Sequence, residues 1–235
     1  MNIILLRPED WLDSSTVELR DRRHVHIRDV LKPQIGSSLK VGKLGEARGT
    51  GVVTKLTHDE SQLTISLPQP PPPRHAFDIA LALPRPKMLR RVLRTTAEMG
   101  VEHLHLIHSA RVEKSFWQSP LLQPGRLAEA LQAGLERSGD TVPPQVHMHR
   151  FFKPFIEDTA PALLKDRHGW IAHQTAAEPI SRAKGKALVM LGPEGGFVPF
   201  ELELAESIGF TGGHLGSRTL SVDTALAAAL SQALG

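Results

Sequence analysis

The segment FDIALALPRPKMLRRVLRTTAEMGVEHLHLIH, residues 77–108, decides the fold class. It starts with an apolar run of strand length, continues with a stretch of helical periodicity and ends in a second apolar run. The residues of the helical stretch that share one face, at spacings of three and four, are Leu89, Val92, Leu93 and Thr96. Gly100 follows this stretch and predicts its end. The pattern predicts strand, helix and strand in succession.

Apolar and helical runs continue to alternate downstream. A further strand is predicted at ALVML (187–191), and helices are predicted at RLAEALQAGLERSG (126–139), ELELAESIG (201–209) and VDTALAAALSQAL (222–234). Such alternation is typical of a mainly parallel sheet with helices on both faces. Residues 73–235 are therefore predicted to form an α/β domain.

The run PQPPPPR, residues 68–74, marks a domain boundary, because consecutive prolines continue neither a helix nor a sheet ladder. Upstream, the segments HVHIRDVL (24–31), EARGTGVVTKL (46–56) and SQLTISL (61–67) carry β-branched residues and alternation, separated by glycines. Residues 1–72 are predicted to form a small β-rich barrel.

Composition excludes several classes of protein. Of the 235 residues, 40% are hydrophobic and 23% charged, as in globular proteins, and none is cysteine. Disulfides, thiolate metal sites and a cysteine nucleophile are thereby excluded. Arg7, Glu9 and Asp10 interrupt the first apolar run, and no later run is long enough for a bilayer. We expect a cytoplasmic protein.

Basic residues gather in one place, although the net charge is only +3. Residues 85–94 contain no acid, and their cations are Arg85, Lys87, Arg90, Arg91 and Arg94. The helical period puts the last four opposite the apolar face, as a stripe that could follow an RNA backbone with salt-dependent affinity. The alternative is a solvated helix face on which Glu98 pairs with Arg94.

The loop LGPEGGF, residues 191–197, lies between the predicted strand ALVML and a helix that starts near Pro199. Ligands bind outside the carboxyl ends of strands in open α/β sheets, and glycines let the backbone approach a ligand closely. The alternative is a tight strand-to-helix turn. The loop matches neither the dinucleotide nor the nucleoside-triphosphate fingerprint.

A second glycine-containing connection, HLGSRTLSVDTA (214–225), also joins a short strand to a helix. Ser221 or Asp223 could cap that helix. Two such loops at one sheet edge could form two walls of a pocket, with Arg218 available for a carboxylate or phosphate. The segment ERSGDTVPP (136–144) reads as a surface loop.

Three histidine pairs raise a metal hypothesis: HVH (24–26), HLH (103–105) and HMH (147–149). Each pair would face one side of a strand. No Asp, Glu or Cys completes a recognisable ligand set, so we predict no metal. We expect sheet-surface or RNA-facing histidines instead.

Taken together, LGPEGGF, LGSRTLSVDTA, ERSGDTVPP and residues 83–115 resemble the RsmE-type 16S rRNA uridine-N3 methyltransferases of the SPOUT superfamily. The resemblance covers nearly the whole chain and the order of its motifs. It implies an N-terminal PUA-like barrel that binds RNA, with Arg22 and Arg23 as expected contacts, and a C-terminal SPOUT domain with a trefoil knot. It also implies a homodimer, S-adenosylmethionine as cofactor, and 16S rRNA of the small ribosomal subunit as substrate.

By the same resemblance, the cofactor contacts are mostly backbone. They are expected at Leu191, Gly192, Gly195, Gly196, Leu215, Gly216 and Leu220. Near the reacting centre we expect Glu194, Arg218 and Asp223. Glu194 or Asp223 would assist loss of the uracil N3 proton, and Arg218 would stabilise the anionic ring. The absence of cysteine agrees with attack by a ring nitrogen.

The chain departs from the family pattern at four positions. Ser221 replaces an arginine, Asp223 a glutamate and Asp140 an arginine, and Val198 stands where a serine or threonine usually precedes the helix proline. The first three remove or shorten charged groups. The alternatives are therefore a non-catalytic RNA-binding or ribosome-assembly relative, or a methyltransferase with another RNA target. A nucleotide-dependent oxidoreductase would need a phosphate-binding fingerprint that the chain lacks.

Overall fold

The computed structural model describes residues 1–182 and 185–233, which form two compact units. The first unit comprises Met1–Pro73 with Gln132–Pro143, and the second comprises Arg74–Leu131 with Pro144–Gly235. Gln132–Pro143, which the sequence analysis placed in the second domain, thus groups with the first. Each unit is described by itself below.

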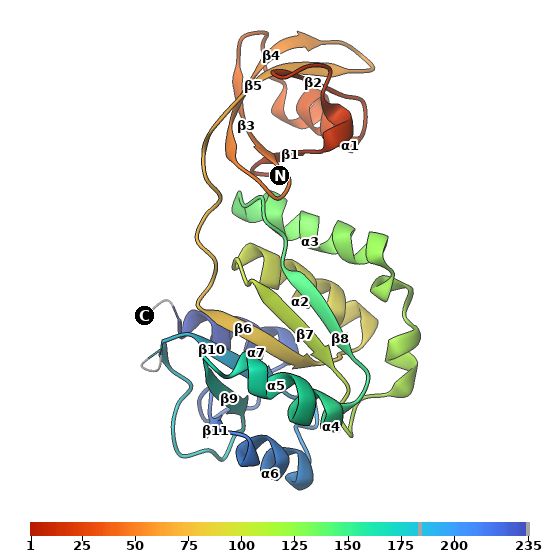
Figure 1. Cartoon of the computed structure of the whole chain (residues 1–235). Helices are drawn as coiled ribbons and strands as arrows, with labels where there is room; N and C mark the ends of the chain where they lie inside the picture. The colour runs from red at the N-terminus through yellow and green to blue at the C-terminus, as the bar shows by residue number, and fades with distance from the viewer. Residues whose placement is uncertain (183–184, 234–235) are drawn as a thin grey trace. The chain divides into compact units, whose positions relative to one another are not determined.

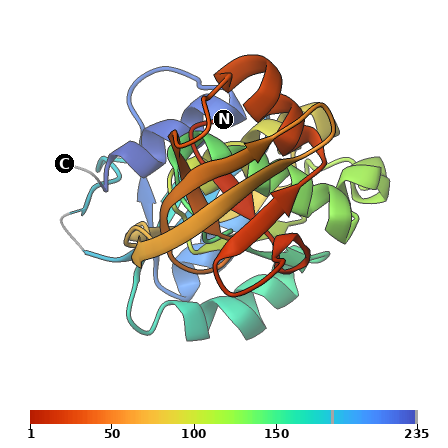
Figure 2. The ribbon, with the colours of Figure 1, turned by 90° about the horizontal axis from the view of Figure 1, so that it is seen from above.

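The first unit contains a curled five-stranded mixed sheet in the order β1-β3-β4-β5-β2 (Figure 2). Strands β1 and β3 are parallel, and the other pairs are antiparallel. The strands are β1 (Ile4–Leu6), β2 (Thr16–Leu19), β3 (Ser38–Lys43), β4 (Arg48–Leu56) and β5 (Ser61–Gln69). The strands predicted at residues 46–56 and 61–67 are confirmed as β4 and β5.

The segment HVHIRDVL is helical, which corrects its prediction as a strand. It forms most of helix α1 (Arg22–His26) and a π-helical turn at Ile27–Leu31. Asp21 caps α1 by accepting from the Arg23 N–H at 2.9 Å. His24 and Ile27 are buried, three residues apart on one helix face. The segment is too short for its apolar residues to distinguish this spacing from alternation.

Arg23 is a buried structural residue, which corrects its prediction as an RNA contact. Its guanidinium forms a two-pronged pair with Asp10, at 2.6 and 2.7 Å, and also donates to the carbonyl oxygen of Leu5. Only 3% of Arg23 is exposed. Arg22 is half exposed and pairs with Glu136. Burial with hydrogen-bonded carboxylates is what a guanidinium requires away from water.

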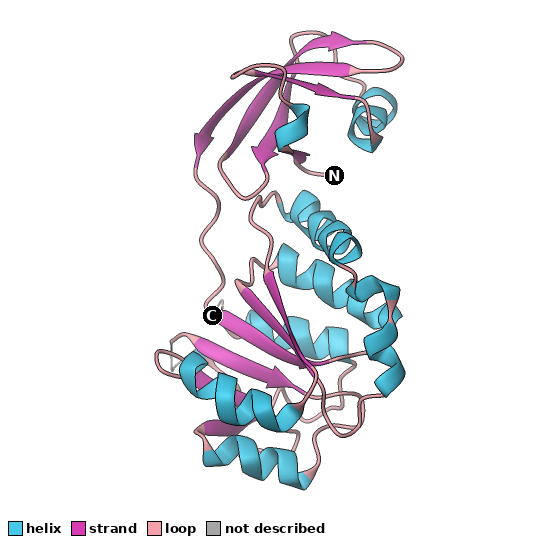
Figure 3. Cartoon of the chain, turned by 45° about the vertical axis from the view of Figure 1, so that its right-hand side comes forward, coloured by secondary structure: helices cyan, strands magenta, loops and turns pink. Residues whose placement is uncertain are grey.

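The second unit is built on a six-stranded sheet in the order β11-β9-β10-β6-β7-β8, with all pairs parallel (Figures 1 and 3). All six residues of β6 are buried, as expected for a strand covered on both faces. The strands are β6 (Phe77–Ala82), β7 (His103–Ile107), β8 (Gln145–His149), β9 (His168–Ala172), β10 (Ala187–Leu191) and β11 (Phe210–Gly213).

Helices cover both faces of this sheet (Figure 1). Helices α2 (Pro86–Glu98) and α7 (Val222–Ser231) lie side by side on one face, and the helical stretch of α4 (Phe152–Pro154) and α5 (Ala160–Leu163) covers the other. The second unit also contains α6 (Pro199–Ser207) and the first part of α3 (Pro124–Ser138), whose residues from Gln132 onward group with the first unit. The predicted helices are confirmed, and Leu234, the last residue predicted in α7, lies outside the described residues.

Strand order places the site. The chain adds β7 and β8 on one side of β6, then forms β9, β10 and β11 on the other side, with β10 inserted between β9 and β6. The loops that leave β9, β10 and β11 therefore meet at one edge of the sheet, outside the carboxyl ends of its strands. In open α/β sheets this is where ligands bind.

Candidate functional site

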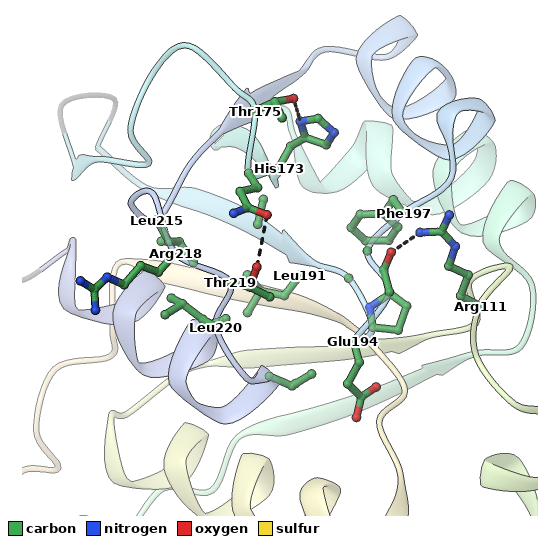
Figure 4. Close-up of a pocket in the computed structure, with 18 of the residues that line it drawn as sticks. Arg111, His173, Thr175, Leu191, Glu194, Phe197, Leu215, Arg218, Thr219 and Leu220 are labelled. Atoms are coloured by element: carbon green, nitrogen blue, oxygen red, sulfur yellow. Dashed lines mark hydrogen bonds between the residues drawn. The ribbon is translucent and has the colours of Figure 1, made fainter.

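A cavity of about 520 Å³ lies at this edge, within the second unit (Figure 4). Its walls are the segments that follow β9, β10 and β11, together with Arg111 and the start of α7. The size is in the range of small-molecule sites. All seven residues predicted to contact the cofactor line it, namely Leu191, Gly192, Gly195, Gly196, Leu215, Gly216 and Leu220.

The first wall is the glycine loop after β10. The Gly196 N–H donates to the Pro193 carbonyl at 2.8 Å, and Gly196 has a φ of +72°. An added Cβ at Gly196 would meet no heavy atom within 4 Å, so the space beside this backbone is open. A left-handed glycine thus turns the chain sharply and keeps the wall free of side chains.

The second wall is the loop after β11. Gly216 has a φ of +107°, and its N–H donates to His214 Nδ1 at 3.1 Å. Gln174 connects this loop to the segment after β9, because its amide nitrogen donates to the Ser217 carbonyl and its oxygen accepts from the Thr219 hydroxyl, both at 3.4 Å. The loop is therefore held at its middle by a side chain from a neighbouring strand end.

Sequence reasoning missed part of the pocket. The segment His173–Thr175 after β9 forms a third wall, and Arg111, after β7, donates to the carbonyl of Gly195 (Figure 4). The polar residues that directly follow the buried strand WIA could have indicated the third wall. Arg111 gave no such signal, because its partner is 84 residues away.

A buried carboxylate fixes the glycine loop to its neighbour. Glu201, 3% exposed, accepts from the Ala110 N–H at 2.7 Å and from the Val198 N–H at 2.9 Å. The second bond satisfies the backbone N–H of Val198, which precedes α6 and has no side-chain oxygen to cap the helix. Glu201 therefore joins the loop after β7 to the residue that precedes α6.

The three predicted catalytic residues do not converge. Glu194 and Arg218 line the cavity, but Figure 4 shows their charged ends pointing away from each other. Asp223 lies outside the described lining, in the first turn of α7. The Ser221 hydroxyl, which donates to Asp223 at 2.6 Å, and the Arg91 guanidinium lower the pKa of that carboxyl. Asp223 is thereby a weaker base.

The departures at Ser221 and Asp140 have local structural roles. Ser221 is the N-cap residue directly before α7, but its hydroxyl bonds to Asp223 and Thr224 instead of capping the backbone. Asp140 belongs to the first unit, where its carboxylate accepts from the N–H groups of Thr141 and Val142 at 2.6 and 3.1 Å. Asp140 thus shapes the turn after α3.

The cationic stripe on α2 has the predicted arrangement. Leu89, Val92, Leu93 and Thr96 are buried, and the stripe's Lys87, Arg90, Arg91 and Arg94 are exposed. Three ion pairs involve this region: Arg85–Glu194 at 3.3 Å, Arg91–Asp223 at 3.3 Å and Arg94–Glu98 at 3.8 Å. The predicted Arg94–Glu98 pair is present. The other two pairs link Arg85, just before α2, to the first glycine loop, and Arg91 of α2 to the first turn of α7.

A second cavity, of about 350 Å³, adjoins the first. It is lined by Arg85, Lys87, Met88, Arg91 and Glu194. Glu194 contributes to both cavities and therefore stands on the wall that they share.

The histidines of HLH and HMH form a ladder between β7 and β8. His103 Nδ1 is 3.1 Å from His147 Nε2, and His105 Nδ1 is 3.1 Å from His149 Nε2. Burial and the neighbouring imidazoles lower the pKa of His105 to about 3. His105 is therefore neutral at pH 7. Within residues 1–182 and 185–233, no three His, Asp or Glu side chains are placed to hold one metal ion.

The third pair, HVH, lies in α1, which corrects its prediction as part of a strand. His24 is buried and pairs with the Ser61 hydroxyl at 2.7 Å and the His58 carbonyl at 2.9 Å. It is a hydrogen-bonded core residue of the first unit.

None of the helices described in the structure has the length and apolar character needed to cross a membrane.

Comparison with known proteins agrees with this site. The chain is 28% identical over 247 residues to the ribosomal RNA small subunit methyltransferase E of Treponema pallidum, covering 97% of this chain and 89% of that protein. Its fold is similar to that of ribosomal RNA small subunit methyltransferase E from Neisseria gonorrhoeae bound to S-adenosyl methionine, with a TM-score of 0.77, 22% identity, and 98% and 95% of the two chains covered.

A Legionella pneumophila protein solved with the bound cofactor SAM has the same fold, with a TM-score of 0.73, 20% identity, and 98% and 95% of the two chains covered. The family model for the RNA methyltransferase domain matches residues 71–234. This match includes the whole parallel sheet and both glycine loops. The chain belongs to the RNA methyltransferase domain family.

Proposed function

We propose that this protein transfers the methyl group of S-adenosylmethionine to N3 of a uridine in the 16S rRNA of the small ribosomal subunit. The observation that carries the proposal is the cavity formed by two glycine loops at the carboxyl ends of β10 and β11. The name of the Treponema pallidum relative supports rRNA as the substrate, and the ligand in the Neisseria gonorrhoeae structure supports the cofactor.

The residues of the cavity fit S-adenosylmethionine. Leu191, Leu215, Leu220 and Ala225 offer apolar contacts for an adenine ring, and the glycine loops offer backbone donors and acceptors for its polar edge. When bound, the cofactor supplies an electrophilic methyl group on a sulfonium. In this proposal the predicted residues of the two loops hold the cofactor, and Arg111 holds the first loop through the Gly195 carbonyl.

The chain's own residues would manage the proton of the uracil ring. We assign Glu194 as its acceptor, because it lines the cavity, whereas Ser221 and Arg91 already stabilise the ionised form of Asp223. N3 would lose its proton to the Glu194 carboxylate and gain the methyl group, and S-adenosylhomocysteine would be released as the second product. Arg218, exposed in the second loop, would stabilise the negative charge that develops on the ring.

The proposed RNA contacts are the exposed cations of α2, Arg85 just before this helix, and Arg22 of the first unit. We further propose that the first unit is a PUA-like domain, which its curled mixed sheet supports. Insertion of β10 between two strands formed earlier supports a trefoil knot.

Action on ribosomal subunits implies a cytoplasmic protein. The proposed homodimer is tested by light scattering, which should give about twice the mass of one chain.

Binding and turnover test the proposal. Calorimetry should detect S-adenosylmethionine but not NAD, and Glu194→Gln should bind the cofactor normally while losing turnover. Transfer of labelled methyl to small ribosomal subunits measures that turnover. NAD binding would favour the oxidoreductase. Cofactor binding without methyl transfer to any RNA would indicate the non-catalytic relative.

A further inference from the structure

The second cavity differs from the first in its charge. Three cationic side chains and one carboxylate line it, and Met88 completes the lining. Its cations are Arg85, Lys87 and Arg91. A small cavity with an excess of positive charge favours an anion, and guanidinium groups bind phosphate with two parallel hydrogen bonds. The position beside Glu194 places such an anion next to the cofactor cavity.

Two carboxylates hold the arginines of this cavity in the structure. Glu194 pairs with Arg85, and Asp223 pairs with Arg91, each at 3.3 Å. The arginine side chains are 64% and 55% exposed. Ion pairs this exposed contribute little to stability, so a phosphate can displace them readily. Among the described residues Lys87 has no ion-pair partner and is available to an incoming anion.

The cations of α2 and Arg85, which directly precedes this helix, fall into two groups. Arg85, Lys87 and Arg91 line the second cavity, whereas Arg90 and Arg94 lie outside its described lining. An RNA backbone that only followed the stripe would use the four stripe cations alike. A cavity instead selects one phosphate at one position.

We propose that the second cavity binds one phosphate group adjoining the methylated nucleotide, and that this phosphate displaces Glu194 from Arg85 and Asp223 from Arg91. The proposal rests on the proposed function, because it takes RNA as the source of the phosphate. Displacement releases the Glu194 carboxylate, on the wall between the cavities, for the proton of the bound base. Substrate binding and assembly of the catalytic site are thereby coupled.

Titration of the whole protein with uridine, uridine 3′,5′-bisphosphate and inorganic phosphate, in the presence of S-adenosylmethionine, tests the cavity without any methyl transfer. The bisphosphate should bind at least about tenfold more tightly than uridine, and Lys87→Gln should remove most of that gain. Arg90→Gln, on the same helix but outside the cavity, should keep the gain. Glu194→Gln should tighten bisphosphate binding, because it removes the competing carboxylate.

Two results would overturn the proposal. Equal losses in Lys87→Gln and Arg90→Gln would mean diffuse attraction to the helix. Inorganic phosphate that binds as tightly as the bisphosphate would mean a site for free phosphate, with no connection to a nucleotide. The outcome is separate from that of the proposed function: the cavity can bind bisphosphate as predicted even if the small subunit receives no methyl group.

Discussion

Acid should destabilise the second unit through the histidine ladder, and His105 is the residue to change. Its imidazole lies beside His103, His147 and His149, and near the Arg167 guanidinium, while Phe155 packs against the ring. In the folded protein the pKa of His105 is lowered from 6.5 to about 3. Unfolding exposes the ring to water and restores its ordinary proton affinity.

The sign of the effect follows from proton binding. Between pH 6.5 and pH 3 the unfolded chain binds a proton at His105 and the folded chain does not. Acid therefore favours the unfolded state, and the stability present above pH 6.5 is lost progressively as the pH falls. Each pH unit well below the unfolded pKa costs about 1.4 kcal/mol. From pH 7 to pH 5 the loss from His105 alone is about 2 kcal/mol.

Urea unfolding at pH 7 and pH 5 measures this loss. In His105→Gln the fall in the free energy of unfolding between the two pH values should be about 2 kcal/mol smaller than in wild type. His147 and His149, whose pKa values burial also lowers, retain their part of the fall. In the control Leu106→Ala, on the same strand, the free energy of unfolding should be about 2–5 kcal/mol lower than in wild type at both pH values, so that its fall between them is unchanged. Equal falls in wild type and His105→Gln would refute the reasoning.

Three further changes test other parts of the structure. Asp10→Asn should lower the free energy of unfolding in urea by about 1–3 kcal/mol, because among the described residues it leaves only the partly exposed Asp21 carboxylate to pair with the buried Arg23 guanidinium; a loss as small as that of the exposed change Asp59→Asn, at most about 0.5 kcal/mol, would contradict this. Gly196→Val should weaken S-adenosylmethionine binding about tenfold by calorimetry, because a β-branched residue disfavours a positive φ. The control Gly209→Val places the same kind of residue at another positive φ, outside the described lining of the cofactor cavity, and should leave the affinity for S-adenosylmethionine unchanged. Arg90→Gln should reduce the slope of RNA affinity against salt by about 0.7 on a logarithmic scale, and an unchanged slope would exclude Arg90 as a phosphate contact.

The second unit was predictable because its local patterns agree with its tertiary structure. Buried strands such as β6 and β10 are continuous apolar runs, and α2 has a clear polar and apolar face. The segment HVHIRDVL was mispredicted because eight residues fit either period. The position of β10 between β9 and β6 depends on contacts between distant segments, which local periodicity does not contain.

The site was predictable where it consists of backbone. Glycine loops that follow buried strands indicate a ligand site by sequence alone, and both loops line the cavity. Side-chain partners were not predictable in the same way. Arg23 looks like a surface cation in the sequence, yet Asp10 pairs with it in the core. Arg91 and Asp223 are 132 residues apart, so only the fold brings them together.

The most direct test of the proposed function is the identity of the methylated nucleoside. Purified protein and labelled S-adenosylmethionine are incubated with small ribosomal subunits whose 16S rRNA lacks 3-methyluridine. The 16S rRNA is then digested and its nucleosides are analysed by mass spectrometry. We predict label in 3-methyluridine, and loss of this label in Glu194→Gln. Label in a different methylated nucleoside would contradict the substrate assignment, and no label in any nucleoside would contradict the activity itself.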